Sequence, residues 1–255
     1  MEELCKEFIE FINILQRVRR ECPWDKKQTP YSLLTYFLEE CYELVESIQS
    51  NAKDNIKEEL GDVFIHIVMQ SLMAEERGDF TLTDVLKNVN NKLITRHPHV
   101  FGEKETESVK EILYNWENIK QEENNKGILD GIPKILPSLI ASFRIQEKAS
   151  HVGFDWKNAK EIFYKLKEEI SELEKAIEEN NKENIEGEIG DLLFTIVNIS
   201  RHLGIDPELA LRKSNLKFVN RFKFLERKIK EEGKKWEDVT IEEMDKWWEI
   251  SKNSF

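Results

Sequence analysis

The stretch Glu39-Glu40-Cys41-Tyr42-Glu43, followed by Glu59-Leu60-Gly61-Asp62, occurs twice in this chain. The second copy reads Glu168-Glu169-Ile170-Ser171-Glu172 and then Glu188-Ile189-Gly190-Asp191. Each position of the second copy lies 129 residues after its counterpart, as 168 minus 39 and 191 minus 62 both give. One fixed offset across both segments indicates a single structural module that is written twice.

Weaker echoes extend the repeat beyond these segments. Downstream, Asn90-x-Lys92-x3-Arg96 returns as Asn215-x-Lys217-x3-Arg221, and Trp116-Glu117-x2-Lys120 returns as Trp248-Glu249-x2-Lys252. Upstream, Trp24-Asp25-Lys26 resembles Phe154-Asp155-Trp156-Lys157. The repeat therefore covers most of the chain.

The stretch between the two copies is polar and contains Gly127, Gly131 and Pro133, which is typical of a linker. We therefore predict a first module over 1–122, a linker over 123–135 and a second module over 136–255.

Apolar residues recur at helical spacing in both modules, and no segment shows the alternation of a strand. The chain is therefore predicted to be all-α, with two tandem helical bundles. The first expected helix carries its apolar stripe over 4–18 and ends at Cys22-Pro23. The other expected helices cover about 31–49, 56–77 and a segment starting near Thr83, with Thr81 or Thr83 as its cap, then 137–150, 159–179, 183–202 and 206–232.

Charge and composition exclude several classes of protein. The formal net charge of the 255 residues is −12, which argues against a dedicated nucleic-acid or anionic-membrane binder. No stretch of 18 apolar residues occurs, and the acidic start Met1-Glu2-Glu3 is unlike a signal peptide. Three cysteines form no disulfide framework, so we expect a reducing, cytoplasmic location without membrane contact.

The repeated acidic residues are candidate metal ligands. Glu40 and Glu43 are three residues apart and share one helix face, as do Glu59 and Asp62 on the next helix. The loop between these helices is short, so they are antiparallel neighbours and the two pairs can face each other. The corresponding set in the second module is Glu169, Glu172, Glu188 and Asp191.

Four carboxylates at close range raise one another's pKa values unless a cation offsets their charge. Oxygen ligands suit Mg²⁺, with Mn²⁺ as a possible substitute. The competing interpretation is that these glutamates are ordinary solvated side chains. Gly61 and Gly190, each in mid-helix, suggest a close approach of backbones or simply tight helix packing.

Other phosphate-handling and metal chemistries lack their motifs. No histidine stands three residues after a glutamate, so a di-iron bundle is excluded. The cysteines show no zinc-site spacing with His97 and His99, no P-loop occurs, and no His-Asp dipeptide is present.

The repeated basic residues are candidates for phosphate binding. Lys92 and Arg96 are four residues apart on one helix face, as are Lys217 and Arg221, and Lys120 and Lys252 could join them. The alternative is ordinary helix surface. Trp248 could stack on a base, although a tryptophan at helical spacing is more often part of a core.

These motifs together resemble the all-α nucleoside triphosphate pyrophosphohydrolases. The two-copy form is similar to the MazG proteins in its motifs C-P-W-D near residue 22, R-H-P-H-V-F at 96–101, V-G-F-D-W at 152–156 and N-x-K-F-x3-F at 215–222. The resemblance covers essentially the whole chain. It implies a helical homodimer that uses magnesium to hydrolyse nucleoside triphosphates to the monophosphate and pyrophosphate.

The resemblance also implies roles for individual residues. Glu39 and Glu168 would order or activate the attacking water, and the four carboxylates of each module named above would bind the metal. The nucleotide-contacting residues it implies are Lys92, Arg96 and Lys120 with Trp116 in the first module, and Lys217, Arg221, Trp248 and Lys252 in the second.

The mechanism we hypothesise is attack by a metal-ordered water on the α-phosphorus, with pyrophosphate as the leaving group. Two alternatives remain open. One is hydrolysis of inorganic pyrophosphate or of a damaged nucleotide, and the other is a non-catalytic helical dimer that binds a nucleotide or a regulatory partner.

Overall fold

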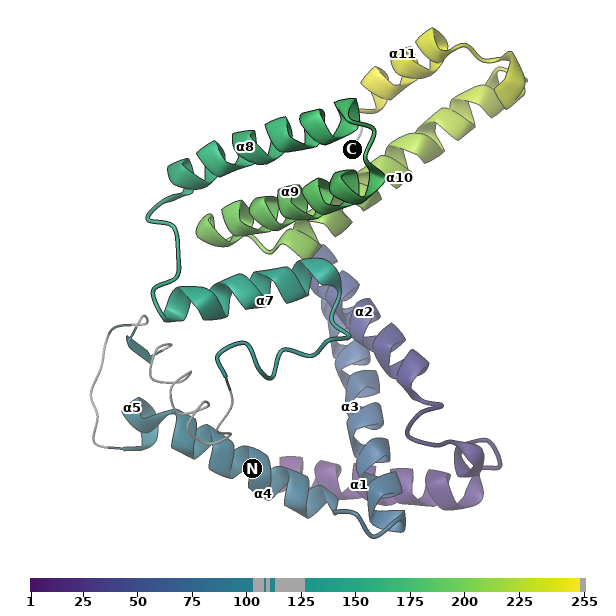
Figure 1. Cartoon of the computed structure of the whole chain (residues 1–255). Coiled ribbons are helices and arrows are strands. Elements are labelled where there is room, and N and C mark those ends of the chain that lie inside the picture. The colour runs from purple at the N-terminus through teal and green to yellow at the C-terminus, as the bar shows by residue number, and fades with distance from the viewer. Residues whose placement is uncertain (103–107, 109–110, 113–126, 253–255) are drawn as a thin grey trace. The chain divides into compact units, whose positions relative to one another are not determined.

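The computed structural model describes residues 1–102, 108, 111–112 and 127–252. All regular elements in this part of the chain are helices (Figure 1), which confirms the predicted all-α fold. The chain divides into two compact units, Met1–Glu107 and Ser108–Phe255. The predicted module boundary near residue 122 lies outside the described residues and stays a prediction.

The first unit is built around a long central helix, α3. Its buried face, with Val68, Met69, Leu72 and Met73, packs against Leu15 of α1 and forms the core of this unit. The elements are α1 (Glu2–Glu21), the 3₁₀ turn η1 (Asp25–Lys27), α2 (Leu34–Ser50), α3 (Lys53–Glu76), α4 (Leu82–Arg96) and the short α5 (Pro98–Phe101).

The second unit repeats the hairpin of the first and then continues differently. Its elements are α7 (Ser138–His151), α8 (Ala159–Glu178), α9 (Lys182–His202), α10 (Pro207–Glu231), the 3₁₀ turn η2 (Trp236–Asp238) and α11 (Ile241–Ser251). A buried glutamine ties α7 to the hairpin, because Gln146 Nε2 donates to the Phe194 carbonyl at 2.8 Å.

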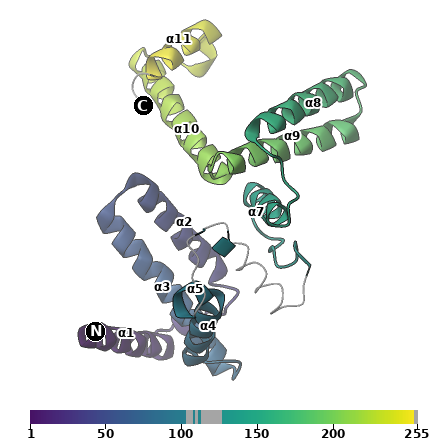
Figure 2. The ribbon, with the colours of Figure 1, turned by 90° about the vertical axis from the view of Figure 1, so that its left-hand side faces the viewer.

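Within each hairpin the two helices pack against each other as an antiparallel pair, α2 with α3 and α8 with α9 (Figures 1 and 2). Each turn contains one asparagine in the left-handed region, Asn51 with φ 55° and Asn180 with φ 51°. Asparagine adopts this conformation at little cost, and it lets the following N–H reach back to the helix. Ala52 N donates to Ser47 O at 3.1 Å, and Asn181 N to Ala176 O at 3.3 Å.

Two of the described helices start with a capping box. Thr81 caps α4 and forms a capping box with Asp84, which settles the choice between Thr81 and Thr83. Thr240 and Glu243 form the same box at the start of α11, a helix that the periodicity analysis did not include. Pro98 separates α4, which ends at Arg96, from the short α5, which starts at Pro98 itself.

One prediction about packing is wrong within the described chain. A Cβ built on Gly61 or on Gly190 would meet no atom within 4 Å, so no backbone of the described residues approaches closely there. Both glycines lie on open faces of their helices. None of the described helices is long and apolar enough to cross a membrane.

Candidate metal and nucleotide site

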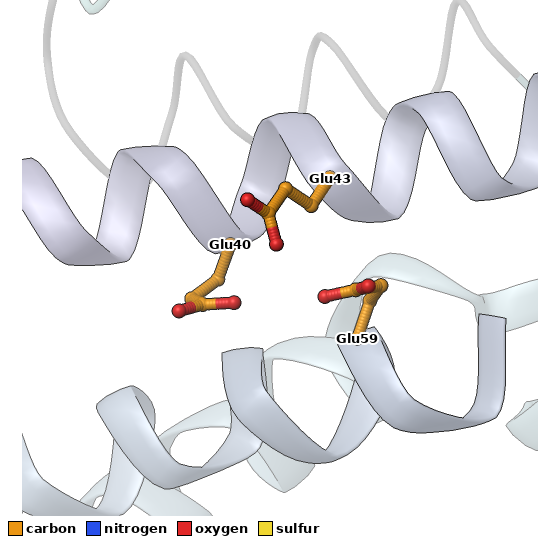
Figure 3. A group of neighbouring side chains, drawn as sticks. All are labelled: Glu40, Glu43 and Glu59. Atoms are coloured by element: carbon orange, nitrogen blue, oxygen red, sulfur yellow. The ribbon is translucent and has the colours of Figure 1, made fainter. Parts of the chain in front are cut away.

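The first carboxylate cluster lies across the α2–α3 hairpin. Glu40 and Glu43 extend from α2 toward Glu59 on α3 (Figure 3), and carboxylate oxygens of the three residues lie within 4.8 Å of one another. Burial, followed by the charges of Asp62, Glu43 and Glu59, raises the pKa of Glu40. Burial and the neighbouring carboxylates raise the pKa of Glu59 as well. The cluster is therefore a site of uncompensated negative charge.

The second carboxylate cluster has the same construction on α8 and α9. Oxygens of Glu169, Glu172 and Glu188 lie within 4.8 Å of one another, and Glu169 is only 4% exposed. Burial and the charges of Glu172, Glu169 and Asp191 raise the pKa of Glu188, while the charge of Lys165 opposes that shift.

Asp62 and Asp191 lie beside these groups of three rather than within them. Each is near enough to act electrostatically, since Asp62 raises the pKa values of Glu40 and Glu59, and Asp191 raises that of Glu188. On α3 and α9 they stand one turn beyond Glu59 and Glu188. They are therefore placed to complete each set without being part of its closest contacts.

The donor atoms of both clusters fit a hard divalent cation. Every donor is a carboxylate oxygen. Burial and then mutual repulsion raise the pKa values of Glu40 and Glu188, and a positive charge between the carboxylates would relieve that repulsion. Magnesium prefers such ligands and leaves part of its coordination shell for water and phosphate.

The two clusters differ in their nearest cation. In the second, Lys165 Nζ lies 2.6 Å from Glu168 Oε1 and 2.8 Å from Glu169 Oε1. These hydrogen bonds raise the pKa of Lys165. In the first cluster the position 129 residues earlier is Tyr36, whose ring contacts Trp24 with 5.9 Å between centroids. Glu39, the counterpart of Glu168, is exposed.

The predicted nucleotide-contacting residues of the second module meet at the packing of α10 and α11. The Trp248 ring lies 5.1 Å from the Phe218 ring, and the Arg221 guanidinium lies 5.8 Å from the Trp248 centroid. Trp248 is partly buried, so it has both an apolar contact and an accessible surface. Lys217 is on the same helix as Arg221, and Lys252 pairs with Glu249 of its own helix.

These basic and aromatic residues are not in contact with the carboxylates. Within the described part of the chain, no hydrogen bond, ion pair or ring contact joins Lys217, Arg221 or Trp248 to the second cluster. In the first module Lys92 and Arg96 lie on α4. Lys120 and Trp116 fall outside the described residues.

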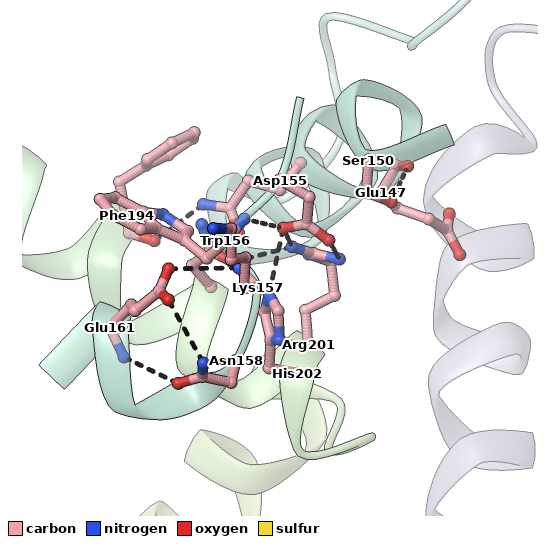
Figure 4. A network of polar contacts seen from close by, with 12 residues as sticks. Glu147, Ser150, Asp155, Trp156, Lys157, Asn158, Glu161, Phe194, Arg201 and His202 are labelled. Carbon is pink, nitrogen blue, oxygen red and sulfur yellow. Dashed lines mark hydrogen bonds and ion pairs between the residues drawn. The ribbon is translucent and has the colours of Figure 1, made fainter. Parts of the chain in front are cut away.

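Sequence reasoning missed the polar network that holds α9 to the loop after α7 (Figure 4). Asp155 accepts two hydrogen bonds from Arg201, one of 3.0 Å between Arg201 Nη1 and Asp155 Oδ2, and His202 Nε2 lies 3.0 Å from Asp155 Oδ1. Burial acts to raise the pKa of Asp155, but the hydrogen bonds from Arg201 and His202 outweigh it and the pKa is lowered.

We call the contacts of Asp155 with Arg201 and His202 the second clamp, because they join two segments distant in sequence. The first unit has a comparable clamp. The Arg19 guanidinium of α1 donates to both carboxylate oxygens of Glu76 on α3 at 2.8 Å, and to the Gln28 carbonyl at 3.0 Å. The echo of Trp24-Asp25 in Phe154-Asp155 marked the segment of the second clamp only, because Arg19 pairs with the Glu76 carboxylate and contacts Asp25 through its backbone carbonyl. It gave no signal for the partners, because Arg201 is 46 residues from Asp155 in the sequence.

Comparison with known proteins adds independent evidence. The MazG nucleotide pyrophosphohydrolase domain matches twice, at residues 28–101 and 157–224. A Thermotoga maritima protein described as nucleoside triphosphate pyrophosphohydrolase/pyrophosphatase MazG is 45% identical over 99% of this chain and 98% of its own length. The Escherichia coli K12 nucleoside triphosphate pyrophosphohydrolase is 39% identical over 93% of this chain and 94% of its own.

A third relative differs in length. The uncharacterized protein YabN of Bacillus subtilis is 42% identical over 98% of this chain, but the match covers 53% of that protein. Each of the two matched domain segments contains one complete carboxylate cluster.

Proposed function

Because the chain belongs to the MazG nucleotide pyrophosphohydrolase family, we propose that it hydrolyses nucleoside triphosphates to the monophosphate and pyrophosphate with the help of magnesium. The observation that carries the proposal is the pair of three-glutamate clusters. In each, carboxylate oxygens lie within 4.8 Å of one another across a helix hairpin. Such clusters suit a cation that also binds a triphosphate.

The residues proposed to hold magnesium, or manganese in its place, are those of the two clusters with Asp62 or Asp191 beside them. When bound, the cation would neutralise phosphate oxygens and polarise the phosphorus centre. The proposed role of Glu168, and of Glu39 in the first module, is to accept a hydrogen bond from the water that attacks the α-phosphorus.

The remaining proposed roles concern the nucleotide. Lys217, Arg221 and Lys252 would donate to the triphosphate and stabilise the charge that grows on the leaving pyrophosphate. Trp248 would stack on the base, and its contact with Phe218 would hold the ring in place. Lys92, Arg96 and Lys120 are the corresponding proposals for the first module.

We also propose that the chain works as a homodimer. Both hairpins expose large apolar side chains along their length, which a single chain leaves in contact with water. On the second hairpin these are Ile170, Ile177, Ile189, Leu193, Phe194 and Ile196. Light scattering on the eluting peak of a size-exclusion column would test this, and a mass near 30.2 kDa would contradict it.

The test of the activity is ³¹P NMR of a mixed nucleoside triphosphate sample with the protein and Mg²⁺, with EDTA as the control. We expect monophosphate and pyrophosphate, and no product with EDTA. If nucleotide binds but no phosphorus-containing product forms, the non-catalytic dimer is favoured. A panel of canonical and oxidised nucleotides would separate general from damaged-nucleotide hydrolysis.

A second activity, hydrolysis of pyrophosphate itself, is supported by the name of the Thermotoga relative, which includes pyrophosphatase. It would appear in the same experiment as orthophosphate. Pyrophosphate supplied alone, with and without Mg²⁺, would separate this activity from further breakdown of the first product.

A further inference from the structure

We propose that Lys165 is a built-in counter-cation of the second carboxylate cluster, so that this cluster binds a free divalent cation more weakly than the first cluster does. The inference rests on the proposed role of the clusters as cation sites. It adds that the two sites have the same kinds of ligand but differ in their affinity for a divalent cation when no nucleotide is present.

The position of Lys165 carries the inference. Its ammonium is 2.8 Å from Glu169, the most buried ligand of the cluster, and 2.6 Å from Glu168. Lys165 stands four and three residues before these glutamates on α8, so the helix itself holds the charges together. With only 33% of its side chain exposed, the pair is partly shielded from water.

The first cluster has no such partner among the residues that the structure describes. The equivalent position is occupied by Tyr36, whose ring packs edge-on against Trp24. No ion pair links Glu40, Glu43 or Glu59 to a basic side chain within residues 1–102, 108, 111–112 and 127–252. Among these described residues, no basic side chain therefore pairs with its negative charge.

The difference has a direct consequence for cation binding. An ion that binds the second cluster through Glu169 must first replace a hydrogen-bonded ammonium, and that exchange offsets part of the gain. An ion that binds the first cluster has no paired ammonium to replace within the described residues. A charge-assisted hydrogen bond is strong enough to change a binding constant by roughly 10-fold or more.

The test is a titration of the full chain with Mn²⁺ and no nucleotide, with the free ion followed by its EPR signal. We expect a tighter class of site that E43Q removes and a weaker class that E172Q removes. K165M should tighten the weaker class by roughly 10-fold, and Y36K should weaken the tighter class. Thermal melting of each variant checks that the fold is intact.

The outcomes separate this inference from the proposed function. If Mn²⁺ binds both clusters but K165M leaves the affinity of the second unchanged or lower, the role of Lys165 is wrong and the cation sites stand. If neither E43Q nor E172Q changes Mn²⁺ binding, the clusters are not cation sites and both ideas fall together.

Discussion

The two carboxylate clusters have the same ligand spacing, yet their charge environments differ. Both place three glutamates within 4.8 Å across a helix hairpin. In the second cluster, Lys165 forms ion pairs with Glu168 and Glu169. At the equivalent position of the first cluster, the Tyr36 ring contacts the Trp24 ring instead. The repeated motif thus places the glutamates in the same arrangement in both modules. The residue one turn before the motif, Lys165 or Tyr36, decides whether a positive charge lies beside them.

The comparison is tested most strongly by removing one equivalent ligand from each cluster. E172Q should lower kcat/KM for nucleoside triphosphates by about 100-fold, the size expected for loss of a group that supports transition-state charge. E43Q, the matched variant, should have a smaller effect, because Arg221 and Trp248 meet in the second module. The reverse order would assign turnover to the first module.

The next largest difference is expected in the free energy of unfolding when the acidic residue of each clamp is replaced. In D155N, Arg201 loses its charged partner, and since that arginine side chain is only 12% exposed we expect unfolding to become easier by about 2 kcal/mol. E76Q should cost less than about 1 kcal/mol, because Glu76 is 49% exposed and Arg19 keeps its carbonyl acceptor. Urea unfolding at pH 7 would measure both.

The clamp of Asp155 should also show a pH signature. The pKa of Asp155 is lowered in the folded chain despite its burial, because Arg201 and His202 bond to the ionised form. Its stabilisation is therefore present above the ordinary carboxyl pKa of about 4 and is lost as the pH falls through the lower folded value. The difference between wild type and D155N should shrink below about pH 4, and a constant difference would contradict this.

A smaller effect, on KM, is expected when Trp248 of the second unit is compared with Trp24 of the first. W248A should raise KM for nucleoside triphosphates roughly 10-fold, because stacking of a base on an aromatic ring is worth about 1–3 kcal/mol. W24A removes an exposed tryptophan that contacts Tyr36 in the first unit and should leave KM unchanged. Equal effects on KM would remove Trp248 from the proposed base site.

The smallest effects should be equal in the two units. T81A and T240A each remove a threonine that forms a capping box, at the start of α4 and of α11. Each should cost about 1 kcal/mol of stability, measured by thermal melting. A much larger loss for T240A would mean that α11 depends on its cap more than on its packing against α10.

Much of the fold could be predicted from the sequence because helical periodicity and the repeat reinforce each other. The hairpins, their order and the clustering of Glu40, Glu43 and Glu59 all follow from spacing along the helix and a short turn. The helix α11 was missed, although Thr240 and Glu243 form a capping signature that could have revealed it.

Other features depend on contacts that spacing cannot show. Gly61 and Gly190 were interpreted as points of close approach, but their neighbourhood is open in the described chain. The pairing of Arg201 with Asp155 joins distant parts of the sequence. Lys165 is different, because its spacing of three and four residues before Glu168 and Glu169 on one helix could have revealed the pairing.

The short turns that contain Asn51 and Asn180 join helices whose carboxylates must face each other, so the clusters are sensitive to insertions and deletions in these helices. Each helix residue turns its side chain by about 100°, so adding or deleting one residue between Glu43 and Glu59, or between Glu172 and Glu188, would rotate one set of carboxylates away from the other. The number of residues between the glutamates therefore fixes how the carboxylates face each other. Substitutions in the turn should disturb the cluster less than a change of its length.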